Sequence, residues 1–364
     1  MDIKFYDYEK LYDFNVFQLI FEIKKNLLNG EFILGSDLDL FEKNLAKFLN
    51  VNYAIGLSDC TNALTVGIKC LNFKERSEII IPSHTFIATL NSIYNSGHIP
   101  IVADIDDSGL LDLNQIEKYI SKNTAAILLV NINGNTVNIE KLKKISEKYN
   151  IEIIEDNAQG FGSKYKNIFC GTFGKFGALS FYPTKILGCF GDGGAILTDD
   201  KELYQKIRKY RNHGRDESGK ILSMGGNYRL DNFQAKILNM RLLKLADKIK
   251  FRRTMANAYN NYLSNNKNIF LPKINKDVFC SYQNYEILCN RRDDLQDFLK
   301  KKKIQTLVQW KGIPLHQQTF FNFKCKMKNC DEYFKKCLCL PLNYSINKNK
   351  IKYISDSIIQ FYGD

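Results

Sequence analysis

The sequence predicts an α/β protein with a large three-layer α/β/α domain around a mainly parallel sheet and a smaller α+β C-terminal domain. Short β-rich runs alternate with helix-like stretches from about residue 53 to 198, a pattern that builds parallel sheets with crossover helices. The alternation stops beyond about residue 250. A chain of 364 residues also exceeds the ordinary size of one core. We expect domains at 1–249 and 250–364.

The first elements are an amphipathic helix and a short strand. Ser36 is the expected cap of this helix, which places Leu38, Phe41, Leu45, Phe48 and Leu49 on one face. The strand Tyr53 to Leu57 follows. Strands and helices then alternate in the runs Glu78 to Ile81, Thr85 to Asn95, Ile101 to Ala103, Leu113 to Ile120, Ala125 to Val130, Ile139 to Tyr149 and Ile151 to Ile154.

Two further strands, Gly177 to Phe181 and Gly194 to Thr198, flank a glycine-rich stretch. A long helix is expected from Leu230 to about Arg253. In the smaller domain, Tyr285 to Leu288 and Gln305 to Gln309 are candidate strands. Because ligands of open parallel sheets bind at the carboxyl ends of the strands, we expect the functional site at that edge.

The charge balance leaves two interpretations open. The 52 Lys and Arg against 39 Asp and Glu give a net charge of +13, which fits a nucleic-acid or membrane-surface partner or small anionic substrates. The basic residues are mostly scattered lysines, and the run Lys300 to Lys303 follows Phe298 as the solvated end of a helix would. It lacks interleaved aromatic residues for base stacking. We expect neither nucleic acid nor a membrane as partner.

The ten cysteines do not form a disulfide framework by spacing. The charged and polar start of the chain, Met1 to Phe14, has no apolar secretion core, so a cytoplasmic, reducing compartment is expected. The cluster Cys325, Cys330, Cys337 and Cys339 lacks C-x-x-C spacing and histidine. We expect no metal there and interpret Cys330 to Leu342 as a helix running into a short strand. No apolar stretch of about 18 residues predicts a membrane span.

Lys185 is the candidate for covalent chemistry. It follows the expected strand and precedes the glycine-rich segment Gly188 to Gly194. A lysine beside a flexible turn can reach into a pocket and form a Schiff base with an aldehyde cofactor. A solvated surface lysine is the alternative for this residue taken alone.

Asp156 emerges where the buried-looking strand Ile151 to Ile154 ends. A carboxylate at this place can hold a pyridine nitrogen protonated and make the ring an electron sink. A helix cap or a structural ion pair is the alternative.

The segment Leu57 to Ala63 links a strand to a helix, and free amides at such a helix start bind phosphate. Ser180 can add a hydroxyl to the same phosphate. An ordinary capped turn is equally compatible with this segment.

Together these residues resemble the DegT/DnrJ/EryC1/StrS sugar aminotransferases, which have the aspartate-aminotransferase fold (type I). The resemblance runs from Gly30 to His316 and is most specific in four blocks. These are Glu155 to Gln159, Ser180 to Gly194, Arg211 to Arg215 and Asn227 to Ala235. It implies pyridoxal 5'-phosphate (PLP) as cofactor, L-glutamate as amino donor and a homodimer with shared active sites.

The resemblance also implies residue roles. Lys185 becomes the Schiff-base lysine and general base, Asp156 pairs with the pyridine nitrogen, Gln159 lies near the ring hydroxyl and Phe86 stacks on the ring. The phosphate is held by Cys60, Thr61, Ser180 and, from the neighbouring subunit, Asn227.

Two departures from the family pattern concern the pocket. Cys60 stands where many members have glycine, and Asn131 to Gly134 replaces a His-Leu-Tyr-Gly type of segment. Asn131 and His316 are therefore candidate substrate contacts, with a surface or structural histidine as the alternative for His316.

The substrate branch rests on the segments Gln283 to Glu286, Thr306 to Trp310 and Asn133 to Asn138. They look most like the branch that forms dTDP-4-amino-4,6-dideoxyglucose from the 4-keto-6-deoxy sugar, for surface polysaccharides such as lipopolysaccharide O-antigen. A dTDP-3-keto-6-deoxyhexose 3-aminotransferase is the alternative within the family. Lys185 argues against the family's dehydratase, in which histidine replaces the lysine, and a basic regulatory or nucleic-acid-binding protein is the alternative of another class.

Overall fold

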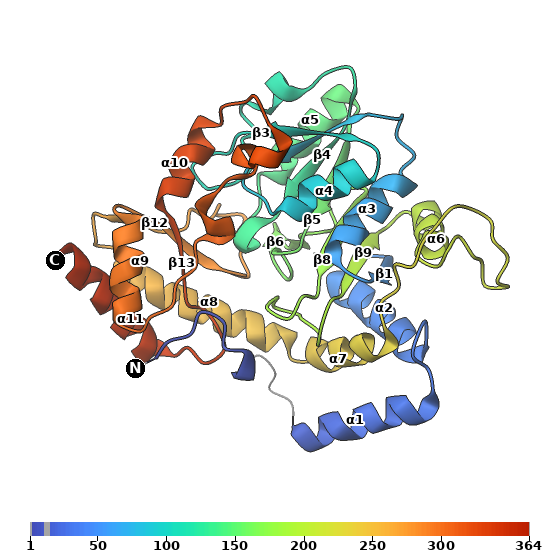
Figure 1. Cartoon of the computed structure of the whole chain (residues 1–364), viewed down its shortest axis with the longest axis horizontal. Coiled ribbons are helices and arrows are strands. Elements are labelled where there is room, and N and C mark those ends of the chain that lie inside the picture. The colour runs from blue at the N-terminus through green and yellow to red at the C-terminus, as the bar shows by residue number, and fades with distance from the viewer. Residues whose placement is uncertain (1, 11–14, 364) are drawn as a thin grey trace.

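A seven-stranded sheet forms the centre of the computed structural model, which describes residues 2–10 and 15–363 (Figure 1). The strand order is β1-β9-β8-β5-β4-β2-β3. The pairs β2/β3, β2/β4, β4/β5 and β5/β8 are parallel, whereas β9 runs antiparallel to both β1 and β8. The strands are β1 (Tyr53–Leu57), β2 (Glu78–Pro82), β3 (Ile99–Ala103), β4 (Thr124–Val130), β5 (Glu152–Asp156), β8 (Phe176–Ser180) and β9 (Gly194–Thr198). The predicted mainly parallel sheet is confirmed.

Helices cover this sheet because their apolar stripes pack against its buried strands. They are α2 (Ser36–Leu49), α3 (Cys60–Cys70), α4 (Ile87–Asn95), α5 (Ile139–Tyr149) and α6 (Lys201–Tyr210). The predicted face of α2 is mostly buried, but Ser36 is its first helical residue and not its cap. Gly35 holds the cap position without a side-chain hydrogen bond. The expected helix at residues 113–120 is only the 3-10 turn η2 (Ile116–Tyr119).

The expected long helix after Leu230 is two helices, α7 (Asn232–Leu242) and α8 (Leu245–Leu263). Between them Leu243 is 87% exposed and Lys244 leaves the helical conformation. α8 runs through residues 249 and 250 without a break. The division into two domains at that point stays a prediction.

The C-terminal part contains a three-stranded antiparallel sheet in the order β10-β12-β13. The strands of this sheet are β10 (Ile269–Phe270), β12 (Tyr285–Cys289) and β13 (Cys337–Leu340), and the helices of the C-terminal part are α9 (Arg292–Lys301), α10 (Lys328–Lys336) and α11 (Lys348–Tyr362). Lys300 and Lys301 end a helix as predicted, and α10 runs into β13 as predicted for the cysteine-rich segment. Among the described residues no cluster of metal ligands is present.

Several short elements complete the fold. The predicted strand at residues 305–309 is absent from the described sheets, because Leu307 makes only an isolated bridge to Cys339 and the chain then enters the 3-10 turn η4 (Gln309–Gly312). The N-terminal segment joins the C-terminal part, since Ile3 bridges Ile304. The remaining elements are η1 (Tyr8–Lys10), η3 (Ile132–Gly134), β6 (Lys164–Tyr165), β7 (Ile168–Phe169), β11 (Val278–Phe279), η5 (Leu315–Gln317) and η6 (Thr319–Phe321).

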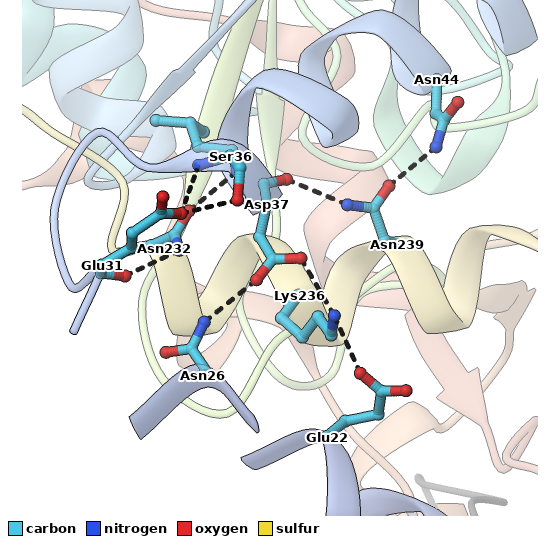
Figure 2. Close-up of polar contacts among 10 residues, drawn as sticks. Glu22, Asn26, Glu31, Ser36, Asp37, Asn44, Asn232, Lys236 and Asn239 are labelled. Atoms are coloured by element: carbon cyan, nitrogen blue, oxygen red, sulfur yellow. Dashed lines mark hydrogen bonds and ion pairs between the residues drawn. The ribbon is translucent and has the colours of Figure 1, made fainter. Parts of the chain in front are cut away.

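Helix α1 (Val16–Asn29) lies along the outside of the molecule, next to α2 and α7 (Figure 1). Polar contacts join it to these helices (Figure 2). Asn26 donates to Asp37 at 3.0 Å, and Lys236 of α7 bridges Glu22 at 2.8 Å and Asp37 at 3.1 Å. No helix of the described chain is long and apolar enough to span a membrane.

Candidate active site

A cavity of about 570 Å³ opens at the carboxyl ends of the central strands. The ends of β5 and β8, the start of α3 and the turn before α4 contribute to its wall, together with segments of the C-terminal part. Its lining includes seven of the predicted site residues: Cys60, Thr61, Phe86, Asp156, Gln159, Ser180 and Lys185. The site therefore forms at the edge that the sheet topology predicts.

Lys185 lies on the segment that leaves β8. Its backbone amide donates to the carbonyl of Tyr182 at 2.8 Å. Gln283 fixes the backbone on both sides of the lysine, because its Nε2 donates to Thr184 O at 3.1 Å and its Oε1 accepts from Ile186 N at 3.1 Å. The amine itself has no hydrogen-bond or ion-pair partner in the described part of the chain, so it is available to a ligand.

The burial of Lys185 favours the neutral form of its amine. Burial lowers the pKa of the Lys185 amine, and Cys60 and Asp156 oppose this shift. A neutral amine is the form that can attack an aldehyde or remove a proton.

Asp156 is the last residue of β5, and its carboxylate faces the cavity. Oδ2 accepts a hydrogen bond from Thr89 Oγ1 at 2.7 Å, and Oδ1 accepts one from Ala158 N at 3.1 Å. Burial raises the pKa of the Asp156 carboxyl, while these two donors and Lys185 lower it. A protonated pyridine nitrogen next to this carboxylate would stabilise its charged form further.

The turn between β1 and α3 presents the start of a helix to the cavity. Asp59 caps α3 by accepting from Asn62 N at 2.8 Å, which leaves the amides of the first turn, at Cys60 and Thr61, directed outward from the helix. Gly194 allows β9 to approach this turn, since a Cβ there would lie 2.4 Å from the Asp59 carbonyl carbon. Ser180 ends the neighbouring strand β8 and lines the same cavity.

Two aromatic rings form another part of the wall. Phe86 is 53% exposed, which is unusual for a phenylalanine in a turn between a buried strand and a helix. Its ring centroid lies 6.5 Å from that of Trp310, with the planes inclined by 32°. The exposed face of Phe86 is available for stacking on a flat ligand.

Three predicted residues lie outside this cavity. Asn227 is exposed and lines a separate depression with Arg229 and Gln234. His316 is buried, with Nδ1 2.6 Å from Ser83 Oγ and Nε2 2.9 Å from Asp331 Oδ1.

Asn131 is fully buried behind the wall. Its Nδ2 donates to Glu155 at 3.1 Å and to Asn157 at 2.9 Å. A direct substrate contact would require a rearrangement of His316 or Asn131, since both are bound to interior partners.

The wall also contains seven residues that the sequence did not identify as individual site residues: Tyr6, Tyr182, Asp192, Gln283, Asn284, Gln309 and Trp310. All but Tyr6 lie in segments that the family resemblance had singled out. A signal existed for some of them, because amide and aromatic side chains crowd the segments Gln283 to Tyr285 and Gln309 to Trp310. No sequence pattern connects Tyr6 with the site, since it is almost three hundred residues distant from those segments.

The residues present fit PLP. The helix start with Cys60 and Thr61, and the hydroxyl of Ser180, offer donors to a phosphate. A buried carboxylate, Asp156, and an unpartnered amine, Lys185, occupy the same cavity. These are the groups that a pyridine nitrogen and an aldehyde require.

Comparison with known proteins agrees with this geometry. The chain is 30% identical over 341 residues to a dTDP-3-amino-3,4,6-trideoxy-alpha-D-glucose transaminase of Streptomyces venezuelae, covering 92% of this chain and 90% of that one. It is 33% identical over 334 residues to the UDP-2-acetamido-2-deoxy-3-oxo-D-glucuronate aminotransferase of Pseudomonas aeruginosa, covering 91% and 92%. Among solved structures, ntda from Bacillus subtilis with bound cofactor PMP superposes with a TM-score of 0.90 at 27% identity, covering 99% of this chain and 85% of that one.

The family profile gives the same assignment. Residues 18–359 match the DegT/DnrJ/EryC1/StrS aminotransferase family. This match covers most of the chain and includes every predicted residue of the cavity. The protein therefore belongs to the DegT/DnrJ/EryC1/StrS family and is a PLP-dependent sugar-nucleotide aminotransferase.

Proposed function

We propose that this enzyme transfers the amino group of L-glutamate to C4 of dTDP-4-keto-6-deoxyglucose and forms dTDP-4-amino-4,6-dideoxyglucose for a surface polysaccharide. The observation that carries the proposed chemistry is the presence of both Lys185 and Asp156 in the lining of one cavity. Bound PLP supplies the electron sink that makes the carbon next to the nitrogen acidic.

The chain's own groups then move the proton. The Lys185 amine removes the proton from the α-carbon of glutamate and, in the second half of the reaction, delivers a proton to the sugar carbon that receives nitrogen. Asp156 keeps the pyridine nitrogen protonated throughout. Burial lowers the pKa of the Lys185 amine, which favours its neutral, basic form, and a carboxylate in a dry site interacts strongly with a cation.

The amide side chains of the cavity wall support a sugar substrate. Gln283, Asn284 and Gln309 line the wall with neutral amides, whose carbonyl oxygens can accept from hydroxyl groups, while Gln283 keeps one N–H that can donate. The C4 assignment is supported by the likeness of the segments around these residues to the 4-amino branch. The 3-amino branch is the second candidate, and it is favoured by the name of the Streptomyces relative, a 3-amino sugar transaminase.

We also propose a homodimer in which Asn227 acts in the neighbouring site. Among the described residues that line the cavity, Lys185 is the one cationic side chain, against the carboxylates of Asp59, Asp156 and Asp192. The cofactor phosphate, the nucleotide diphosphate and the donor carboxylates are all anionic, so further cations and donors must come from elsewhere. Asn227 is exposed, and its Oδ1 accepts a hydrogen bond from Arg229 Nε at 2.9 Å. These side chains are suited to supply a donor and a cation to the cavity of a second copy.

The surface of α1 supports the same assembly. Beyond its polar contacts with α2 and α7, it carries exposed apolar side chains at Phe17, Ile20, Phe21, Leu27 and Leu28. Phe17 is 84% exposed. An apolar helix face of this kind is buried most readily against a second subunit.

A cytoplasmic location is part of this proposal. All ten cysteines lie in the described part of the chain and carry free thiols. Free thiols are usual in a reducing compartment.

The visible spectrum of the PLP-loaded protein tests the activity. Glutamate should bleach the visible band, dTDP-4-keto-6-deoxyglucose should restore it, and NMR of the product should place nitrogen at C4. Restoration by a dTDP-3-keto-6-deoxyhexose alone would assign the enzyme to the 3-amino branch. A spectrum that glutamate leaves unchanged would contradict glutamate as the donor.

A further inference from the structure

Glu286 is a buried carboxylate that the transfer reaction does not use directly. It lies in β12 opposite Cys339 of β13 and is 5% exposed. Because side chains alternate along a strand, Tyr285 and Ile287 enter the core on the other face of β12. Glu286 faces the loops that build the wall of the active site.

Four groups surround the carboxylate. Oε1 accepts from Asn133 Nδ2 at 3.0 Å and from the Tyr333 hydroxyl at 2.8 Å. Oε2 accepts from Gln309 Nε2 at 3.0 Å and from the Cys339 thiol at 3.4 Å. Burial and the charge of Glu286 raise the pKa values of Tyr333 and Cys339 well above their ordinary values, so both keep their protons and donate.

An acceptor of this kind fixes the orientation of Gln309. A carboxylate accepts hydrogen bonds but cannot donate them, so the Gln309 amide must turn its Nε2 toward Glu286. The second N–H of the same amide donates to Asn133 Oδ1 at 3.1 Å. The carbonyl Oε1 of Gln309 is therefore directed away from Glu286, where it accepts from Gln159 Nε2 at 3.2 Å.

The carbonyl oxygen of the Gln159 side chain is held by donors, which favours the same orientation of its amide. Its Oε1 accepts from the backbone N–H of Asn133 at 2.9 Å and from Asn284 Nδ2 at 3.4 Å. A backbone N–H can only donate, so both ends of the chain Glu286–Gln309–Gln159–Asn133 demand one orientation of each amide. Gln159 then keeps one N–H of its Nε2 for a ligand in the cavity.

We propose that Glu286 is a positioning residue that acts through Gln309 to hold the Gln159 amide with its N–H toward the oxygen of the cofactor ring. This inference rests on the proposed place of Gln159 beside the ring hydroxyl. A donor at that place stabilises the ionised ring oxygen, whereas a reversed amide would bring a carbonyl oxygen against it. Glu286 thus links the small sheet to the cofactor without touching it.

The substitution Glu286→Gln tests this link, because glutamine fills the same space but no longer dictates the polarity of Gln309. Tyr333→Phe is the matched control, since it removes a donor from the other oxygen of the same carboxylate. Gln159→Ala shows the full effect of losing the amide. Gln309→Leu breaks the chain from the cavity side and replaces Glu286→Gln if that variant fails to fold.

Two measurements are made on each variant. The first is the pH midpoint of the change in visible absorbance of the PLP-loaded protein. The second is the affinity of the cofactor-free protein for PLP, followed through the fluorescence of Trp310, which is the single tryptophan and lines the cavity.

We expect Gln159→Ala to move the midpoint to higher pH and to weaken PLP binding by about three- to tenfold. Glu286→Gln and Gln309→Leu should change both quantities in the same direction by a smaller amount, because the Asn133 N–H still holds the carbonyl end of Gln159. Tyr333→Phe should match the wild type in both measurements. A midpoint that moves in Gln159→Ala but stays in place in Glu286→Gln and Gln309→Leu would overturn the role of Glu286 alone. No movement in Gln159→Ala would overturn the role of Gln159 and this inference with it. An equal movement in Tyr333→Phe would show a general disturbance of the wall and overturn it as well.

Discussion

Thr89 provides a sharp test of the role of Asp156, because it touches the carboxylate but not the cofactor site itself. Its hydroxyl is fully buried, donates to Asp156 Oδ2 at 2.7 Å and lies 2.6 Å from Thr85 Oγ1. Valine has almost the same shape, so Thr89→Val removes this hydrogen bond and leaves the packing of α4 nearly unchanged. A hydrogen bond to a charged group contributes about 1.5–3 kcal/mol.

The expected consequence is a slower reaction with glutamate. If that energy supports the charge pair between Asp156 and the pyridine nitrogen, the rate constant of the glutamate half-reaction falls by about 10- to 100-fold. The hydroxyl stabilises only the charged carboxylate, so its loss raises the pKa of Asp156 further. The acidic limb of the rate profile should therefore move to higher pH.

The same substitution predicts a stability change in the cofactor-free protein. The pKa of Asp156 is raised in the folded state, so its contribution to stability is fully present below the unfolded value of about 3.9 and is lost as pH rises through the folded value. Thr89→Val removes a stabilising contact of the charged form. The loss of stability relative to the wild type should grow over this pH window.

The assay is stopped-flow absorbance with glutamate across pH, together with thermal melting of the cofactor-free protein. Ser92→Ala is the matched control, because Ser92 lies on the same helix, is equally buried and donates only to the backbone oxygen of Thr89 at 2.8 Å. Ser92→Ala should leave the rate and its pH limb unchanged. A Thr89→Val rate within twofold of the wild type, with an unmoved acidic limb, would refute the proposed charge pair.

Three other substitutions test the remaining roles. Lys185→Ala should abolish turnover and the visible band while circular dichroism shows the native fold, and normal turnover would remove Lys185 from the mechanism. Asp156→Ala should lower the steady-state rate by several orders of magnitude, roughly the scale of losing a main electrostatic contact; a near-normal rate would make the carboxylate structural. Equal amounts of Lys185→Ala and Asn227→Ala subunits, dissociated and reassembled at random, should recover more activity than the separate variants. The recovery reaches about a quarter of wild-type activity if both variants are inactive alone, since half of the dimers regain one intact site. No recovery beyond the separate variants would argue against Asn227 acting across subunits.

Local patterns predicted most of the central domain. Period-two and period-3.6 hydrophobicity are properties of short segments, so β1, β9 and α5 were found with their observed bounds. The cavity residues near strand ends followed from the topology rule together with the family resemblance. Cys60, Asp156, Ser180 and Lys185 lie near one another because parallel strands bring their carboxyl ends to one edge.

Two errors concern segments whose local preference did not decide their structure. The segment around Leu243 is helix-favouring and contains neither glycine nor proline, yet α7 ends there, Lys244 leaves the helical conformation and α8 begins at Leu245. The segment Gln305 to Gln309 has strand character, but its backbone amides donate to two different segments of the chain and form no continuous ladder with either. Gln305 N donates to Ile3 O, and Leu307 N donates to Cys339 O.

By itself the sequence determined the α/β class, because hydrophobic periodicity is a property of short segments, and its resemblance to the family named Lys185 and Asp156 as site candidates. Only the tertiary structure decided that Asn131 and His316 are bound inside the wall and that Gln283 fixes the backbone around Lys185. The same holds for the polarity of the chain from Glu286 to Gln159. These contacts join residues far apart in the sequence, and hydrogen-bond direction depends on which groups meet in space.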